Sequence, residues 1–204
     1  MKFDIQQLND KYSHPYYAFV DVEVTTSSAK KGDVLSLGCI IAEGDNFKKV
    51  DSFLGYARPR TYDHWNSYAE NIHKITRERS KTFPDARQTS IEFLKFLAPF
   101  KNADNSPIPF VFHGTHKFDL KMVQMMFAQN SLTNSIDKVF SPDLTISTCS
   151  MFEFFTQLFG VSTIDKKLST MAKTFNIPLD HHEVMSDTNA CYASYRFMRK
   201  AFGI

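Results

Sequence analysis

The feature that most constrains this chain is a hydrophobic run over residues 19–25, FVDVEVT, that carries two acidic residues. Its valines and phenylalanine are typical of a buried strand. Because strand side chains alternate between two faces, Asp21 and Glu23 should point to the same side. Two like charges beside a hydrophobic core are unfavourable unless a cation joins them. We therefore expect Asp21 and Glu23 to hold a hard divalent cation, which prefers oxygen ligands.

The composition is that of a folded domain and limits the classes of function. The chain has 204 residues, of which 43% are hydrophobic and 23% charged, and this favours one large domain. With 24 basic and 22 acidic residues the net charge is only +2, so any surface that binds nucleic acid must be local. The three cysteines show no paired spacing, which favours free thiols in a reducing compartment.

Targeting and membrane signals are missing from the sequence. The first residues contain no long apolar run of the kind found in a signal peptide. No apolar run approaches the roughly 18 residues needed to span a membrane. We therefore expect an intracellular protein with no membrane partner, located in the cytoplasm, although the sequence leaves a nuclear location open.

The order of the predicted elements indicates an α/β fold. Residues 1–15 form a polar lead-in, and residues 16–204 are predicted to form one domain. Three strands joined by short turns indicate an antiparallel meander, at 16–24, 34–42 and 48–56. Two further strands then alternate with helices: strands at 109–112 and 144–146, and helices from Pro84 and over 118–129, 148–159, 168–175 and 184–201, with mixed structure at 57–83 and a linker at 131–143. Such an order predicts a mixed five-stranded sheet flanked by helices.

A third candidate ligand, Asp119, follows the short strand that ends at Phe112. It should lie at the start of a helix, where the helix dipole favours a negative charge. A helix-capping aspartate would have the same position, so this residue alone leaves both interpretations open.

A histidine and an aspartate near the C-terminus have a spacing that separates them on a helix. His182 and Asp187 are five residues apart, which is about 140° beyond a full helical turn. We therefore expect His182 on a loop and Asp187 one turn into the following helix. A loop histidine is suited to proton transfer because its ordinary pKa lies near neutrality. His181 is an alternative for the same role, and two solvated surface histidines would also fit the pattern.

Motifs of several common enzyme classes are absent. The chain contains no G-x-x-x-x-G-K-[ST], no G-x-G-x-x-G and no G-x-S-x-G sequence. Common P-loop nucleotide hydrolases, dinucleotide enzymes and serine hydrolases are therefore not favoured.

Taken in order, these motifs resemble those of the DEDDh exonucleases of the ribonuclease H-like superfamily. That group includes the proofreading subunit of bacterial DNA polymerase III, ribonuclease T and oligoribonuclease. The family motif D-x-E-x-T is matched by Asp21, Glu23 and Thr25, and the motif H-x-I-T by His73, Ile75 and Thr76. The motif F-D is matched by Phe118 and Asp119, and the motif H-x4-D by His182 and Asp187. The resemblance covers roughly residues 16–200, and the order and spacing of the motifs agree with one another.

The resemblance implies a ribonuclease H-like fold and a metal-dependent 3′→5′ exonuclease that releases 5′-mononucleotides. Two Mg²⁺ or Mn²⁺ ions would be held by Asp21, Glu23, Asp119 and Asp187, with Asp21 between them. His182 would take the proton from the attacking water.

The resemblance also implies which residues bind the substrate. The terminal nucleotide would contact Val24, Thr25, His73 and Phe118. Many family members have a leucine after the first motif that wedges against the terminal base, but this chain has Lys30 and Lys31 in that region. We expect Lys30 and Lys31 to contact phosphate instead.

Partners and two alternative functions follow from the same comparison. The expected partner is the 3′ end of a single-stranded nucleic acid, gripped by aromatic stacking and a few cations. A polymerase or another replication or repair protein could be a further partner, and a homodimer is open because several relatives are dimers. The alternatives are a non-catalytic nucleic-acid or polymerase-binding module on the same fold, and a phosphodiesterase acting on small substrates. The sequence does not distinguish DNA from RNA.

Overall fold

The computed structural model describes residues 14–44, 46–101 and 106–203, which form a five-stranded mixed sheet flanked by helices. The strand order is β3-β2-β1-β4-β5. β1 pairs antiparallel with β2 and β2 with β3, whereas β4 runs parallel to β1 and β5 parallel to β4. The strands are β1 (Tyr16–Val24), β2 (Val34–Glu43), β3 (Lys49–Tyr56), β4 (Phe110–Phe112) and β5 (Thr145–Ser147). The first strand therefore occupies the centre of the sheet.

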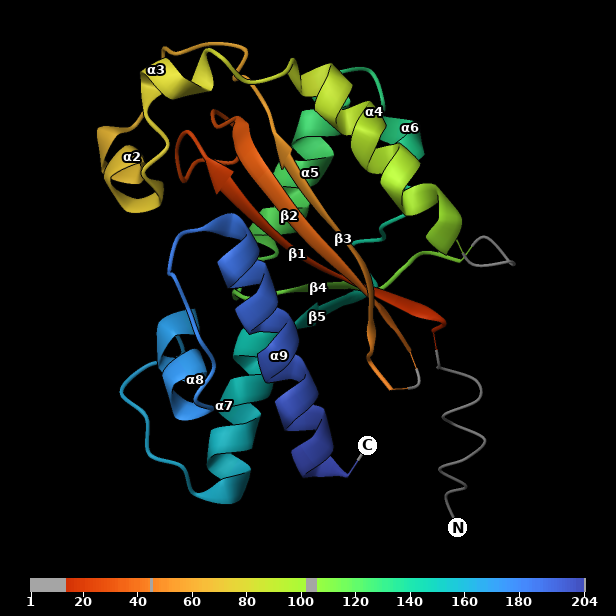
Figure 1. Cartoon of the computed structure of the whole chain (residues 1–204), viewed down its shortest axis with the longest axis vertical. Helices are drawn as coiled ribbons and strands as arrows, with labels where there is room; N and C mark the ends of the chain where they lie inside the picture. The colour runs from red at the N-terminus through yellow and green to blue at the C-terminus, as the bar shows by residue number, and fades with distance from the viewer. Residues whose placement is uncertain (1–13, 45, 102–105, 204) are drawn as a thin grey trace.

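Helices cover both faces of this sheet (Figure 1). One layer contains α4 (Ala86–Leu97), the short helix η1 (Ala98–Phe100), α5 (Phe118–Gln129) and α6 (Thr133–Ile136); the other contains α7 (Thr148–Phe159), α8 (Leu168–Thr174) and α9 (Val184–Phe202). Two short helices, α2 (Ser67–His73) and α3 (Arg77–Ser80), lie beyond the C-terminal end of β1. None of the helices in the described part of the chain is long and apolar enough to cross a membrane.

The two faces of β1 belong to two different hydrophobic cores. Ala18, Val20 and Val22 pack into the core that includes α4 and α5. Tyr17 and Phe19 point to the other face and pack against tyrosines of α9. Because side chains alternate along a strand, Asp21 and Glu23 continue the face that α9 covers. The apolar part of that face thus ends where the two acids begin.

The predicted elements agree with the structure along most of the chain. β1, α5 and α7 have the predicted bounds, and the remaining predicted strands and helices differ by one or two residues at their ends. One prediction was wrong, because the linker 131–143 contains α6. The region 57–83, predicted only as mixed structure, contains α2 and α3. The predicted lead-in over 1–15 lies largely outside the described residues, which begin at residue 14.

Short helices were missed because their sequences are stabilised by local caps. α2 begins at Asn66, whose side chain accepts a hydrogen bond from the Tyr68 amide at 2.9 Å. α3 begins at Thr76, whose hydroxyl accepts a hydrogen bond from the Arg79 amide at 3.1 Å. Capping of this kind compensates for the unpaired amides at a helix start, and it leaves no long apolar period in the sequence.

Candidate metal-dependent active site

Three acidic side chains from two elements meet at the C-terminal end of β1. Carboxylate oxygens of Asp21, Glu23 and Asp187 all lie within 4.8 Å of one another. Asp21 and Glu23 come from β1, and Asp187 comes from the first turn of α9. The alternation of the strand and the start of the helix, both predicted from the sequence, therefore bring the acids together.

Gly38 allows α9 to approach the sheet closely enough for this arrangement. It lies directly opposite Asp21 in the β1–β2 pairing. A Cβ atom at Gly38 would be 2.5 Å from the Thr188 hydroxyl and 3.1 Å from the Val184 carbonyl, both on α9. No side chain other than hydrogen fits that space without moving the helix. The glycine thus fixes the distance from which Asp187 reaches the strand acids.

The loop before α9 surrounds Asp187 with hydrogen bonds. The Nδ1 atom of His181 lies 3.2 Å from one carboxylate oxygen, and the backbone amide of His182 donates to the other at 3.0 Å. His182 adopts φ of 71°, in the left-handed region, and the two imidazole rings stack with centroids 3.7 Å apart. The Glu183 carboxylate caps α9 by accepting from the Ser186 amide at 2.7 Å. His182 is therefore on the loop and Asp187 in the helix, as the spacing predicted.

The fourth acid, Asp119, approaches β1 from the opposite layer. It is the second residue of α5 and is buried, with 8% of its surface exposed. β4 pairs with β1 only at Ala18 and Phe19, so the backbone of Val22 is left free on that side. A hydrogen bond links the Val22 backbone to the Asp119 carboxylate. Asp119 does not cap the helix, whose N-cap residue is Lys117 and has no side-chain cap.

Burial and mutual repulsion raise the pKa values of these acids. Burial, followed by the charges of Asp119 and Glu23, raises the pKa of Asp21 well above its usual range. Burial and the charge of Asp187 raise the pKa of Glu23 to about 8. Burial also raises the pKa of Asp119 and that of Asp187, the latter partly offset by its hydrogen bond to His181. Four carboxylates in this environment cannot all be ionised without a cation.

The residues present fit a divalent cation. No lysine or arginine within the described ranges forms an ion pair with any of the four acids, and His181 is the single basic side chain at ion-pair distance. All four acids offer carboxylate oxygens, the ligands preferred by Mg²⁺ and Mn²⁺. The geometry and the raised pKa values therefore indicate a cluster that needs positive charge and can hold it.

Two of the predicted substrate-binding residues, His73 and Val24, lie beside this cluster. His73, the last residue of α2, lines a pocket of about 330 Å³ together with Glu23 and His182. Its Nδ1 accepts a hydrogen bond from the Ile75 amide at 3.0 Å, and its ring lies near the carbonyl of Val24. The strand register shifts between Glu23 and Val24, which is typical of a β-bulge that redirects the end of a strand.

The other three predicted substrate-binding residues have different surroundings. The buried hydroxyl of Thr25 accepts a hydrogen bond from the Asp33 amide at 3.0 Å, so it fixes the turn between β1 and β2. Phe118 is the first residue of α5, is partly buried, and packs against the core next to Asp119. Lys30 is exposed and lies with Lys121 in a separate hollow, so the structure does not bring it to the acids.

Residues that sequence reasoning did not assign to the site also line it. A second pocket of about 290 Å³ is lined by Asp21, Glu23 and Asp187 and also by His113 and Lys167. Both ring nitrogens of His113 are 3.0 Å from partners, the Thr148 hydroxyl and the Lys166 carbonyl, and burial lowers its pKa to about 4. His113 is therefore a neutral, structural wall of the pocket. No sequence motif marks Lys167, which precedes α8.

Comparisons with known proteins agree with this geometry. A family model described as an exonuclease, of the RNase T type, matches residues 18–195. A comparison with curated protein sequences gave no match.

Among solved structures, apo exonuclease I is similar with a TM-score of 0.75 and 13% identity, covering 92% of this chain and 42% of that one. Cell-death related nuclease 4 is similar with a TM-score of 0.72 and 16% identity, covering 93% of this chain and 65% of that one. A full-length 3′-exonuclease has a TM-score of 0.69 and 12% identity, covering 97% and 68%. The chain thus spans about two fifths of exonuclease I. At these identities the structural likeness establishes the fold alone, whereas the family match extends over most of the sequence. The protein therefore belongs to the RNase T-type exonuclease family, a group of nucleases with the ribonuclease H-like fold.

Proposed function

We propose that this protein is a metal-dependent 3′→5′ exonuclease that releases 5′-mononucleotides from single-stranded ends. The observation that carries this proposal is the meeting of three carboxylates within 4.8 Å, with a fourth bonded to the same strand. Phosphodiester hydrolysis requires positive charge beside the attacking and leaving oxygens. A cluster of buried acids that lacks its own lysine or arginine is suited to acquire that charge from bound metal ions.

The four acids would together bind two Mg²⁺ or Mn²⁺ ions. Asp21, Glu23 and Asp187 would supply ligand oxygens from one cluster, and Asp119 would supply a further one from α5. When bound, the ions supply a water of lowered pKa and stabilise charge on the leaving oxygen.

His182 is the proposed general base. Burial and the neighbouring His181 lower the pKa of His182, so its imidazole is neutral and able to accept a proton near pH 7. Its ring nitrogens make no hydrogen bond with other residues in the described part of the chain, whereas His181 is occupied by Asp187. His181 would thus hold Asp187 in place while His182 takes the proton from the attacking water.

The proposed substrate is supported by the surroundings of the acids and by structural neighbours. The two pockets that share Glu23 and His182 have room for parts of one terminal nucleotide, with about 330 and 290 Å³. Structures of E. coli exonuclease I hold a dT13 oligonucleotide in one case, and single-stranded DNA with a zinc ion in another. Those observations belong to exonuclease I, and for this chain they support a single-stranded ligand.

Digestion of labelled oligonucleotides tests the proposal. Matched single- and double-stranded DNA and RNA, labelled at the 5′ end, would be incubated with Mg²⁺ or Mn²⁺. We expect a ladder that shortens from the 3′ end, no cleavage in EDTA, and none with Asp187→Asn. Glu92→Gln, an exposed acid of α4, is the matched control and should be fully active.

Four results would contradict the proposal. Cleavage from the 5′ end would show that the enzyme has the opposite polarity. Cleavage that resists EDTA would show that hydrolysis does not require divalent ions. Binding without hydrolysis under all conditions would instead support a non-catalytic module. Hydrolysis of a nitrophenyl phosphodiester but of no strand would support an enzyme for small substrates.

A further inference from the structure

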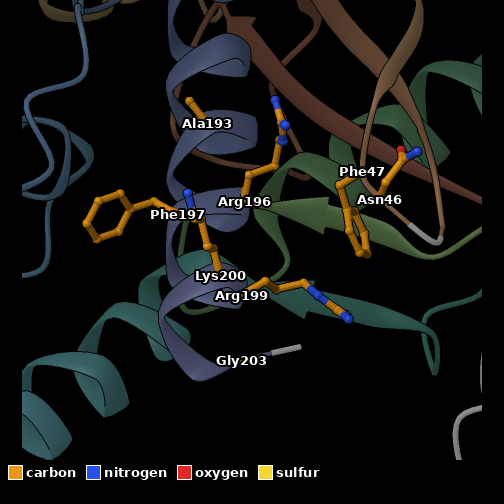
Figure 2. Close-up of a pocket in the computed structure, with 8 residues that line it drawn as sticks. All are labelled: Asn46, Phe47, Ala193, Arg196, Phe197, Arg199, Lys200 and Gly203. Carbon is orange, nitrogen blue, oxygen red and sulfur yellow. The ribbon is translucent and has the colours of Figure 1, made fainter.

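A second candidate binding site lies on α9, towards the end opposite the acids (Figure 2). It is a pocket of about 660 Å³ between the C-terminal half of α9 and the β2–β3 hairpin. Three of its lining residues are cationic: Arg196, Arg199 and Lys200. No carboxylate lines it within the described ranges, and the chain neighbours Asp45 and Ile204 lie outside them. We call these three cations and Phe47 the basic pocket.

Aromatic rings hold the arginines of this pocket. The Arg199 guanidinium lies 4.4 Å from the centroid of the Phe47 ring, and the Arg196 guanidinium 5.5 Å from that of Tyr192. The Tyr192 hydroxyl donates to the Phe47 carbonyl at 2.7 Å and fixes the hairpin, where Phe47 has φ of 52°. A stacked guanidinium keeps its N–H edges available for a planar pair of oxygens, which is how arginine binds phosphate.

The cations of the basic pocket have no acidic partner among the described residues. Tyr195 hydrogen-bonds to Arg199, but the buried Nε atom of Arg199 has no partner. Arg199 is partly buried, and a charge there without an acidic partner is costly, whereas Arg196 and Lys200 are exposed. An anion beside Arg199 would therefore stabilise this site.

The helix dipole explains only part of this cluster. Cations in the last turn of a helix are favourable, and this accounts for Arg199 and Lys200. It accounts neither for Arg196, which lies a turn earlier, nor for the stacking of both arginines. Like charges four residues apart on one helix, such as Arg196 and Lys200, also repel each other. A ligand for the cluster is therefore the more complete explanation.

We propose that the basic pocket binds backbone phosphates of the nucleic-acid strand, at a distance from the end that is hydrolysed. The proposal rests on the proposed function insofar as a strand is the substrate. A positively charged groove that follows the strand backbone is typical of surfaces that bind single strands without reading sequence. The pocket would hold the strand, and the acids at the other end of α9 would hold its 3′ end.

The separation of the two sites predicts a dependence on substrate length. Along α9, Arg196 lies about 14 Å and Lys200 about 20 Å from Asp187, at roughly 1.5 Å per residue. Arg196 is also about half a turn around the helix from Asp187. At about 3.4 Å per stacked nucleotide, a strand needs more than four nucleotides to reach from one site to the other. A dinucleotide cannot reach the basic pocket, whereas a 15-mer can.

The test compares the double variant R196A/K200A with a matched control, R87A/K95A. Both variants replace one exposed arginine and one exposed lysine on a helix, and the control pair is on α4 in the other layer. Binding of a fluorescent 15-mer is measured by anisotropy in EDTA at several salt concentrations, so no catalysis is needed. Hydrolysis of a dinucleotide in Mg²⁺ is measured in parallel.

We expect R196A/K200A to bind the 15-mer about tenfold more weakly at low salt. Two lost phosphate contacts should reduce the slope of log affinity against log salt by about 1.4, at roughly 0.7 per contact on a single strand. Dinucleotide hydrolysis should be unchanged, and the control variant should behave like wild type in both assays.

Two results would overturn the proposal. One is an unchanged 15-mer affinity and salt slope in R196A/K200A. The other is stabilisation by inorganic phosphate at constant ionic strength, lost in R196A/K200A while 15-mer binding is kept, which would make the ligand a small phosphate. If the protein hydrolyses nothing but binding still depends on Arg196 and Lys200, the proposed function fails and the basic pocket stands.

Discussion

Replacing Glu23 by glutamine should stabilise the metal-free protein and abolish its response to divalent ions. Glutamine has nearly the same shape but carries no charge and needs no proton to be neutral. In the wild-type protein without metal, Glu23 must either remain protonated or be ionised next to Asp187 and Asp119. Both states are unfavourable above the ordinary pKa of the side chain, and the substitution removes both.

The sign and the size follow from the pKa of Glu23. Its pKa rises from 4.5 to about 8 on folding, so the folded state retains a proton that the unfolded state releases. This contribution to stability is fully present below about pH 4.5 and is lost as the pH rises towards 8. The ceiling is roughly 5 kcal/mol, at about 1.4 kcal/mol per pH unit. Because Glu23 is partly exposed and its neighbours share the shift, we expect a gain of about 2 kcal/mol.

Thermal unfolding in EDTA at pH 8 measures this gain. For a chain of this size, about 2 kcal/mol corresponds to a rise in Tm of roughly 4–8 °C. The same pair is then compared at pH 5, where the difference should nearly vanish. In Mg²⁺ or Mn²⁺ the difference in Tm between the variant and the wild type should shrink or change sign, because ions that bind only the folded wild-type protein stabilise it. Glu92→Gln should change none of these values.

A Tm of Glu23→Gln equal to or below that of wild type in EDTA at pH 8 would refute the reasoning. It would mean that Glu23 is ionised at no cost in the folded protein, so the acids do not repel one another. An equal metal response in both proteins would show that the ions bind elsewhere.

Three further predictions concern the same site. Asp21→Ala and Asp187→Ala should each abolish hydrolysis of a labelled oligonucleotide while circular dichroism shows a retained fold; full activity in either would remove that residue from the site. His182→Ala should lower kcat by two or more orders of magnitude, whereas His181→Ala should lose about tenfold or less through a misplaced Asp187; the opposite ranking in single-turnover assays would make His181 the base. Gly38→Ala should lower the free energy of unfolding by about 1–3 kcal/mol through overpacking against α9, measured in urea, and no change would mean that the helix moves freely.

Sequence reasoning was most successful where one physical signal dominated. β1 was predicted with its observed bounds because its apolar run is long and rich in β-branched residues. The same run placed Asp21 and Glu23 on one face, since alternation is a property of any strand. Failures occurred at α2, α3 and α6, which have four to seven residues and little periodicity. α2 and α3 have side-chain caps and α6 has none, and all three depend on packing against distant segments, which a short window does not show.

In the candidate site, too, local sequence signals predicted some residues, and contacts between distant segments determined others. The motifs brought Asp119 and Asp187 to the strand acids by resemblance, and the structure places all four together. Nothing in the sequence indicated Gly38, because the need for a glycine arises from the approach of α9, a contact between distant segments. The expectation for Lys30 depended on a turn whose path the sequence does not specify, and its side chain lies apart from the acids.

The two-sided packing of β1 makes folding and chemistry depend on the same pairing. A slip of the strand by one residue would exchange its faces, turning both acids into the core formed with α4 and α5. The tyrosine and phenylalanine that pack under α9 would be displaced at the same moment. A chain folded with the wrong register would thus be too unstable to accumulate, so an assembled sheet carries its acids on the face that α9 covers. Correct folding of the sheet and assembly of the candidate site are then the same event.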